Sequence, residues 1–173
     1  MTLFTTSSFK RSLVLASLVA LGACSKNNTP TPTTVDSSIS WTVDGKDYTG
    51  TAGQTITDGT LLLTGGLSGP SLGDTYGISL NVPAAVGTYN LAQSNGTVIY
   101  MANYQTYFNK VASAYTASNV TGVGSGTVTI TSLTASEVVG TFSFTGSTNF
   151  LPIGNTSPAS TKTITNGKFN VKR

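Results

Sequence analysis

The chain has 173 residues, of which 9% are charged and none is histidine. Without histidine, the chain lacks the usual general base of a serine triad and the commonest transition-metal ligand. Its nine basic residues include Lys10 and Arg11 near the N-terminus, and the others nearly balance the six acidic residues, which excludes the clustered basic face of a nucleic-acid-binding protein.

The first 23 residues have the three parts of a signal peptide. A polar start carries Lys10 and Arg11, an apolar run covers 13–21, and small residues precede Cys24. A helix needs about twenty apolar residues to cross the hydrocarbon core, so this run is too short for a permanent span. We therefore expect residues 1–23 to direct export and then to be removed.

The tetrapeptide Leu21-Gly22-Ala23-Cys24 resembles the lipoprotein box of bacteria. The resemblance implies cleavage after Ala23 and lipid attachment to Cys24, which anchors a protein to a membrane without spanning it. Cys24 is the only cysteine, so no intramolecular disulfide can form. Ser25, and not Asp, follows Cys24, which implies transport to the outer membrane and leaves open which face of it the protein occupies. The alternative is an ordinary secretory leader beside an incidental cysteine.

Residues 24–38 are predicted to form the lipidated end and a flexible tether, and 39–173 a single all-β domain. The tether combines Thr, Ser and Asn with alternating prolines and has no apolar period, so it cannot bury enough surface to fold. The remaining stretch is long enough for one domain with a core. Its many Thr and 19 Gly residues favour strands joined by tight turns.

The first half of the domain alternates apolar and polar residues at the strand period. Asp44-Gly45 and Asp58-Gly59 each separate two alternating segments, and because these residues tolerate positive φ, each dipeptide predicts a hairpin. The run 76–82 is the most regular strand pattern, and Pro83 ends it because proline has no amide hydrogen to donate.

The middle of the domain leaves two interpretations open. Asn95-Gly96 is a strong hairpin signal and predicts that 87–94 pairs with 97–104. The aromatic and apolar residues of 104–115 also fit the i, i+3, i+4 spacing of a helix. This segment is therefore predicted as strand or as one short helix packed on the sheet.

The C-terminal third again shows strand alternation. The segments 127–131 and 138–145 predict two strands, with Gly140 leaving room between larger inward side chains, and 150–160 predicts a loop. In the last segment the apolar residues move from even to odd positions, so a register change is expected at Asn166-Gly167. Together the segments predict an antiparallel β-sandwich or flattened β-barrel of about eight to ten strands.

Several of these segments carry a resemblance to a known family. They are GTVTITSL at 126–133, GTFSF at 140–144, ITNGKFNV at 164–171, VGTYNL at 86–91 and the opening VDGKDY at 43–48. The pattern resembles lipoproteins of Bacteroidota grouped as DUF6252-type domains. The resemblance implies an outer-membrane lipoprotein of unknown function and gives no catalytic residue to carry over.

The residues offer little chemistry for catalysis or for metal binding. Glu137 is the only glutamate, and Asp44 and Asp58 stand in turns where aspartate is expected for backbone reasons. The glycine-rich run 122–126 precedes a strand and not a helix, so no helix N-terminus is available for a phosphate. We therefore predict no cofactor, no metal site and no enzymatic activity.

Aromatic residues give the sequence its one functional option. Tyr104, Tyr107, Phe108 and Tyr115 either belong to the core or form an exposed platform for a sugar or an apolar ligand. The leading hypothesis is a lipid-anchored, non-catalytic cell-envelope module that binds a glycan, a small ligand or another envelope protein. The alternative is a structural or assembly accessory lipoprotein without a small-molecule site.

Overall fold

A computed structural model of the chain describes residues 37–92, 98–120, 122–148 and 159–173. The predicted signal peptide, Cys24 and the predicted tether up to residue 36 lie outside the described residues. Residues Thr34–Arg173 form one compact unit, and its described part contains strands and turns with no helix. The ten strands are β1 (Ser38–Val43), β2 (Lys46–Thr57), β3 (Thr60–Ser68), β4 (Thr75–Pro83), β5 (Gly87–Asn90), β6 (Met101–Phe108), β7 (Val111–Ser118), β8 (Ser125–Leu133), β9 (Glu137–Ser147) and β10 (Thr161–Lys172).

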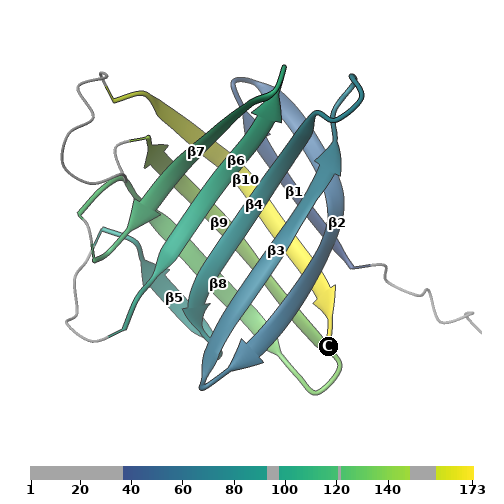
Figure 1. Cartoon of the computed structure of the whole chain (residues 1–173). Coiled ribbons are helices and arrows are strands. Elements are labelled where there is room, and N and C mark those ends of the chain that lie inside the picture. The colour runs from purple at the N-terminus through teal and green to yellow at the C-terminus, as the bar shows by residue number, and fades with distance from the viewer. Residues whose placement is uncertain (1–36, 93–97, 121, 149–158) are drawn as a thin grey trace, which may run out of the picture. The chain divides into compact units, whose positions relative to one another are not determined.

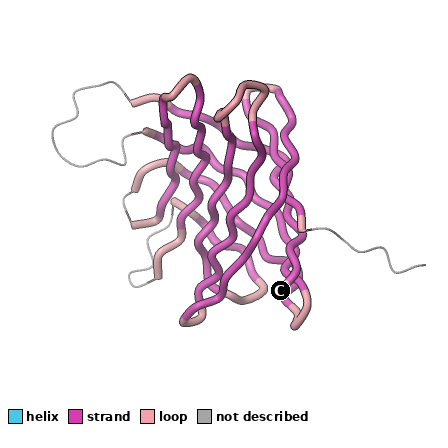
Figure 2. The backbone as a smooth tube through the Cα atoms, turned by 45° about the vertical axis from the view of Figure 1, so that its right-hand side comes forward, coloured by secondary structure: helices cyan, strands magenta, loops and turns pink. Residues whose placement is uncertain are grey.

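The strands form a closed antiparallel barrel. Eight of them follow one another around the ring in the order β10, β1, β2, β3, β4, β6, β7, β9, and pairing of β9 with β10 closes it. Strands β8 and β5 extend the sheet from β9 (Figures 1 and 2). The predicted all-β fold is therefore confirmed, in its barrel form.

The ring has one weak seam, between β7 and β9. Only Thr116 and Ser147 pair across it, because β8 occupies most of the same edge of β9, from Val138 to Thr145. By contrast, β6 and β7 pair along their whole length, from Met101 opposite Ser118 to the end of the hairpin. The β6–β7 hairpin is thus held mainly by its own pairing and by β4.

Three hairpins of the barrel are closed by tight turns whose residues have positive φ. Asp44-Gly45 and Asp58-Gly59 have positive φ and close the β1–β2 and β2–β3 hairpins, as the sequence predicts. Asn109 and Lys110 also have positive φ, 49° and 65°, and close the β6–β7 hairpin. The helical alternative for 104–115 is therefore wrong, because the chain reverses at this turn and its aromatics divide between the two strands.

The hairpin predicted around Asn95-Gly96 is also wrong. The dipeptide itself lies outside the described residues, but the strands on either side of it have other partners. Strand β5 pairs with β8, from Gly87 opposite Ile130 to Asn90 opposite Thr127, and β6 pairs with β4 and β7. Local turn chemistry cannot specify the long-range partner of a strand, and here that partner lies about forty residues further along.

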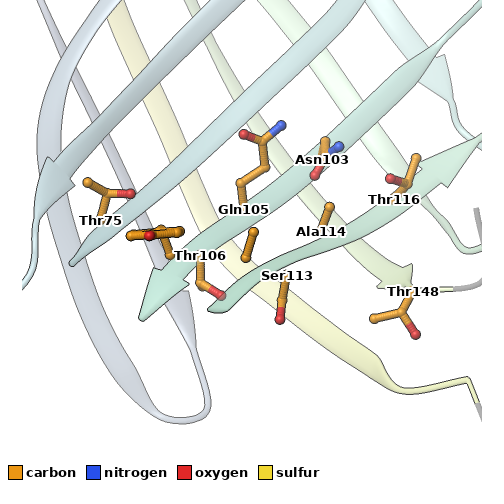
Figure 3. A pocket seen from close by; sticks show the side chains of 10 residues that line it. Thr75, Asn103, Gln105, Thr106, Ser113, Ala114, Thr116 and Thr148 are labelled. Atoms are coloured by element: carbon orange, nitrogen blue, oxygen red, sulfur yellow. The ribbon is translucent and has the colours of Figure 1, made fainter. Parts of the chain in front are cut away.

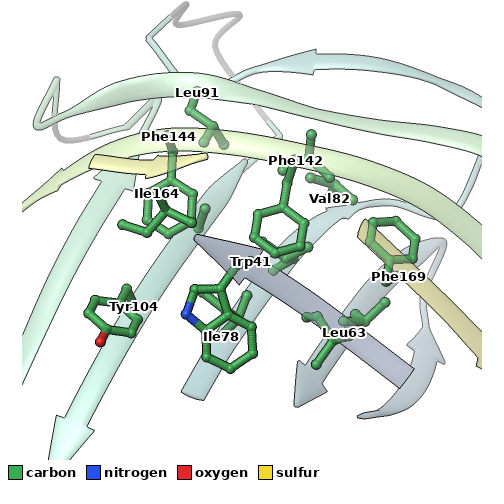
Figure 4. Close-up of a cluster of buried hydrophobic side chains, with 14 of the residues drawn as sticks. Trp41, Leu63, Ile78, Val82, Leu91, Tyr104, Phe142, Phe144, Ile164 and Phe169 are labelled. Atoms are coloured by element: carbon green, nitrogen blue, oxygen red, sulfur yellow. The ribbon is translucent and has the colours of Figure 1, made fainter. Parts of the chain in front are cut away.

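The barrel interior is an apolar core built from alternate residues of most strands. Trp41 is 1% exposed and lies among Ile78, Leu63, Phe142 and Tyr104 (Figure 4). Each fully buried aliphatic or aromatic side chain stabilises the fold by about 1.5–3 kcal/mol. The other buried apolar residues are Ile39, Val43, Leu61, Leu80, Val82, Leu91, Ala102, Ala117, Val128, Ile130, Val138, Phe144, Ile164, Phe169 and Val171.

The C-terminal strands confirm two finer predictions. A Cβ on Gly140 would lie 2.3 Å from Cζ of Phe169, so only glycine leaves room for this ring. The pairing of β10 with β9 shifts register between Ile164 and Gly167, where Asn166 has a φ of 54°. This bulge brings the even-numbered apolar residues before it and the odd-numbered ones after it to the same inner face.

Candidate functional site

The outer faces of β4, β6 and β7 carry a patch of polar and small side chains. Ile78, Leu80 and Tyr104 point into the barrel, so the residues between them point outward. Pairing places these outward residues in rows across the strands, with Ser79 beside Asn103 and Gly77 beside Gln105. The two-residue alternation that points apolar side chains into the core therefore also places amides and hydroxyls together on the outer face of the barrel.

This outer face is hollowed over the β6–β7 hairpin. The hollow has a volume of about 500 Å³. Asn103 and Gln105 project from the same side of β6, and Thr116 stands on the neighbouring strand (Figure 3). The described lining residues are Thr75, Asn103, Gln105, Thr106, Tyr107, Ala112, Ser113, Ala114, Thr116 and Thr148.

The described residues of the lining include no charged side chain, and polar groups stand among apolar surface. The lining combines the Tyr107 ring, which is 42% exposed, with two carboxamides and several hydroxyls. Oδ1 of Asn103 is buried and has no hydrogen-bond partner among the described residues. Because an unpaired buried amide oxygen costs free energy, a bound hydroxyl or water that reached it would remove this cost. Ala112 and Ala114 are small and keep the space above β7 open.

Asp74 connects this hairpin to the loop between β3 and β4. The carboxylate is 4% exposed, and its Oδ1 accepts a hydrogen bond of 3.2 Å from the backbone N–H of Asn109. The backbone carbonyl of Asp74 accepts a further bond of 2.7 Å from Gly69. Thr75 and Tyr107 lie opposite each other on β4 and β6, next to these two hydrogen bonds. The bonds therefore fix the end of the barrel at which both residues lie.

The four aromatics predicted as a platform do not lie together. Tyr107 lines the hollow, and Phe108 is 45% exposed at the end of β6 without lining it. Tyr104 is 3% exposed inside the barrel, and its ring stacks on Tyr115 with centroids 6.0 Å apart. Burial raises the pKa of the Tyr104 phenol well above its ordinary value, with smaller contributions from neighbouring tyrosines.

A second aromatic group gathers inside the barrel near the Asp44-Gly45 turn. The Tyr48 ring stacks on the Trp41 ring with centroids 5.6 Å apart. It is tilted against the Tyr76 ring, with centroids 4.9 Å apart. Burial, and then the neighbouring phenol of Tyr76, raise the pKa of Tyr48. These rings pack against one another and against the core, so they serve the interior of the barrel.

One ion pair lies at the same end of the barrel. Nζ of Lys162 donates a hydrogen bond to Asp44 Oδ2, and this bond is the main cause of a raised Lys162 pKa. Because the Asp44 side chain is 64% exposed, the pair contributes at most about 1 kcal/mol to stability. It fastens β10 to the β1–β2 turn and stands apart from the uncharged hollow.

Two further findings concern only the described residues. No group of three or more His, Cys, Asp or Glu side chains lies there with the closeness that a metal ion requires. Within the same ranges, no helix has the length and apolar character needed to cross a membrane.

Most of the hollow's polar residues were missed by the sequence analysis. Asn103, Gln105, Thr116 and Thr75 are ordinary strand residues, and no motif marks them. A signal was nevertheless present, since Asn103, Gln105 and Tyr107 alternate with the inward Ala102 and Tyr104. This alternation places Tyr107 on the outer face of β6 and Tyr104 on its inner face.

Comparison with known proteins gave one finding. A family model with the description "Domain of unknown function (DUF6252)" matches residues 36–171, which covers the described barrel except Lys172 and Arg173 at its C-terminal end. Neither the search of curated proteins nor the search of solved structures found a match.

Proposed function

Since the chain belongs to the DUF6252 family, a domain of unknown function, we propose its function from the site that the fold builds. The protein is a lipid-anchored, non-catalytic module of the cell envelope, held on the outer membrane through Cys24, and it binds a neutral glycan. The observation that carries this proposal is the uncharged hollow beside Tyr107.

The lining of the hollow matches the chemistry of a sugar. A sugar ring has an apolar face that packs on an aromatic ring, and Tyr107 offers such a ring. Its hydroxyls both donate and accept hydrogen bonds, as do the carboxamides of Asn103 and Gln105 and the threonine hydroxyls around them. Few convergent polar groups beside one aromatic are typical of small-molecule sites.

The same lining supports binding without catalysis. Hydrolysis of a glycosidic bond ordinarily uses a pair of carboxyl groups on either side of that bond. None of the described residues that line the hollow is Asp, Glu, Lys or Cys. A sugar in this hollow would therefore be held and not cleaved.

Tyr107→Ala tests the binding site. We expect the detergent-solubilised full chain to bind a neutral member of a glycan array, and the variant to bind that glycan at least tenfold more weakly in calorimetry, a loss of about 1.4 kcal/mol. Phe108→Ala is the matched control, because it removes the next exposed ring, which does not line the hollow. Equal losses in both variants, or no neutral glycan bound, would refute the proposal.

Cys24→Ala tests the anchor. We expect the wild-type chain, expressed in a bacterium that processes lipoproteins, to incorporate labelled palmitate and to sediment with membranes, because acyl chains hold a protein at the bilayer. The variant should lose both properties. Palmitate labelling that persists in the variant would contradict lipidation at this residue.

A docking role is the alternative function, and one observation favours it. Phe108 and Val111 are 45% and 63% exposed beside the β6–β7 turn, and Leu72 is fully exposed in the loop that Asp74 ties to that turn. Such apolar residues suit contact with another envelope protein. If docking is the function, Phe108→Ser would abolish capture of the partner. Glycan binding would then be at background both in the wild-type chain and in Tyr107→Ala.

A further inference from the structure

The hollow over the β6–β7 hairpin continues across the barrel wall. Two further hollows, of about 430 and 470 Å³, lie over β2, β3 and β4. Gln105 lines all three hollows, and Thr75 lines the first two. Gly66 and Gly77 line both of the further ones. The three hollows share lining residues and lie side by side on the outer face of the sheet, and we refer to them together as the groove.

Strand register shows how the groove runs. Thr51 lies opposite Gly66, Gly66 opposite Gly77, Gly77 opposite Gln105, and Gln105 opposite Ala114. These five residues form one row across β2, β3, β4, β6 and β7. With neighbouring strands about 4.8 Å apart, the row spans roughly 19 Å, at right angles to the strands.

The groove has a low floor between two higher walls. Gly66 and Gly77 carry no side chain at its centre, and a Cβ on Gly66 would lie 2.4 Å from the backbone oxygen of Tyr76. Thr75 and Tyr107 form the row on one side. Ser79 and Asn103 form the row on the other, where the unpartnered Oδ1 of Asn103 lies.

We propose that this groove binds a linear, neutral polysaccharide in an extended conformation, with the hollow beside Tyr107 as its anchoring subsite. The inference rests on the proposed function and extends it from a single sugar to a chain several units long. A 19 Å row is too long for one or two rings, and its glycine floor allows a chain to pass over β3 and β4.

The chemistry of the groove selects for a neutral sugar chain. None of the described residues lining the three hollows is charged, so an acidic polysaccharide would find no cation for its carboxylates. An extended peptide usually binds by adding a strand to a sheet edge. Here β3, β4 and β6 are paired on both sides, so their backbone groups are already used.

Gly77→Thr tests the length of the site. Gly77 lies at the centre of the row, and a Cβ there would meet only the backbone oxygen of Gly65, at 3.4 Å, so the fold has room for the Cβ and the added side chain would fill the floor. Gly87→Thr is the matched control, since Gly87 is a strand glycine outside the groove whose Cβ would also have its nearest neighbour at 3.4 Å. Thermal melts check that both variants fold.

The probes are neutral β-1,4-gluco-, β-1,4-manno- and β-1,3-gluco-oligosaccharides, each as the disaccharide and the hexasaccharide, titrated into the full chain. We expect one hexasaccharide to bind wild type and Gly87→Thr at least tenfold more tightly than its disaccharide. In Gly77→Thr the hexasaccharide should bind about as weakly as the disaccharide, whose own affinity is unchanged.

The outcomes separate this inference from the proposed function. If the disaccharide and the hexasaccharide bind wild type equally, or if Gly77→Thr leaves the hexasaccharide affinity unchanged, the extended groove is refuted while glycan binding beside Tyr107 stands. If no member of the panel and no neutral glycan of the array binds, both fall. Tighter binding of acidic than of neutral members of the glycan array would overturn the selectivity for neutral chains.

Discussion

The inner and outer faces of β4, β6 and β7 differ sharply, although the same three strands supply both. Inside, Ile78, Leu80 and Tyr104 are at most 3% exposed and belong to one continuous apolar core. Outside, Gly77 and Gln105 occupy the alternate positions of β4 and β6 and line a groove. The inner residues are constrained by packing, whereas the outer ones make few contacts that the fold requires.

This difference means that folding constrains the inner side chains more strongly than the outer ones, so the outer positions are freer to serve a function. A barrel needs its inner side chains to fill the interior, and a lost methylene there is costly. Its outer side chains need only be compatible with strands and water. Glycine is a poor strand residue, and the close approach of the Tyr76 backbone explains Gly66, whereas Gly77 has room for a Cβ and so favours an interpretation in terms of a ligand.

The largest effect should come from Leu80→Ala, which breaks the inner face. Leu80 is 1% exposed, so its truncation leaves a cavity and should lower the free energy of unfolding by about 2–5 kcal/mol. The matched change is Ser79→Ala on the adjacent outward position of β4, which should change it by less than about 0.5 kcal/mol. Urea denaturation of both variants checks this contrast. Similar losses would mean that the two faces contribute equally to stability.

A smaller effect should follow from Tyr104→Phe, and it should depend on pH. Burial raises the folded-state pKa of this phenol above the unfolded value of about 10. The stabilisation by the neutral phenol is therefore complete below pH 10 and is lost as pH rises toward the folded pKa, because the unfolded chain ionises first. Denaturation midpoints measured between neutral and strongly alkaline pH should fall more steeply for wild type than for Tyr104→Phe. Parallel curves would contradict the burial of Tyr104.

Local signals in the sequence predicted much of the inner face. Asp44-Gly45 and Asp58-Gly59 fix their hairpins because their positive φ values match the twist of the flanking strands. The parity change at Asn166-Gly167 predicted the bulge because one shifted residue would turn every following side chain outward. Such features depend on neighbours in the chain, and a single sequence is sufficient to identify them.

The errors arose where the decisive partner lies far away in the chain. Asn95-Gly96 carries a strong turn signal, but β5 pairs with β8, and no local pattern specifies this choice. The helical spacing of 104–115 is a coincidence of two strands, since Tyr104 and Tyr115 lie opposite each other across the Asn109-Lys110 turn.

The candidate site was harder to predict than the fold. Tyr107 could be named from the sequence, but its neighbours Thr75 and Thr116 come from separate strands that only the barrel brings together. A polar residue on the solvent side of a strand has no characteristic pattern, because many residues serve equally well there. The groove emerges only when the rows of five strands are placed side by side.

Amide chemical shifts of the isotope-labelled full chain, titrated with the tightest-binding neutral oligosaccharide, would locate the bound sugar on the barrel. If the sugar lies in the groove, the shifts should change most at the outward residues Thr75, Asn103, Gln105 and Tyr107. Changes concentrated instead around Tyr48 and Lys162, at the end of the barrel near the Asp44-Gly45 turn, would contradict it.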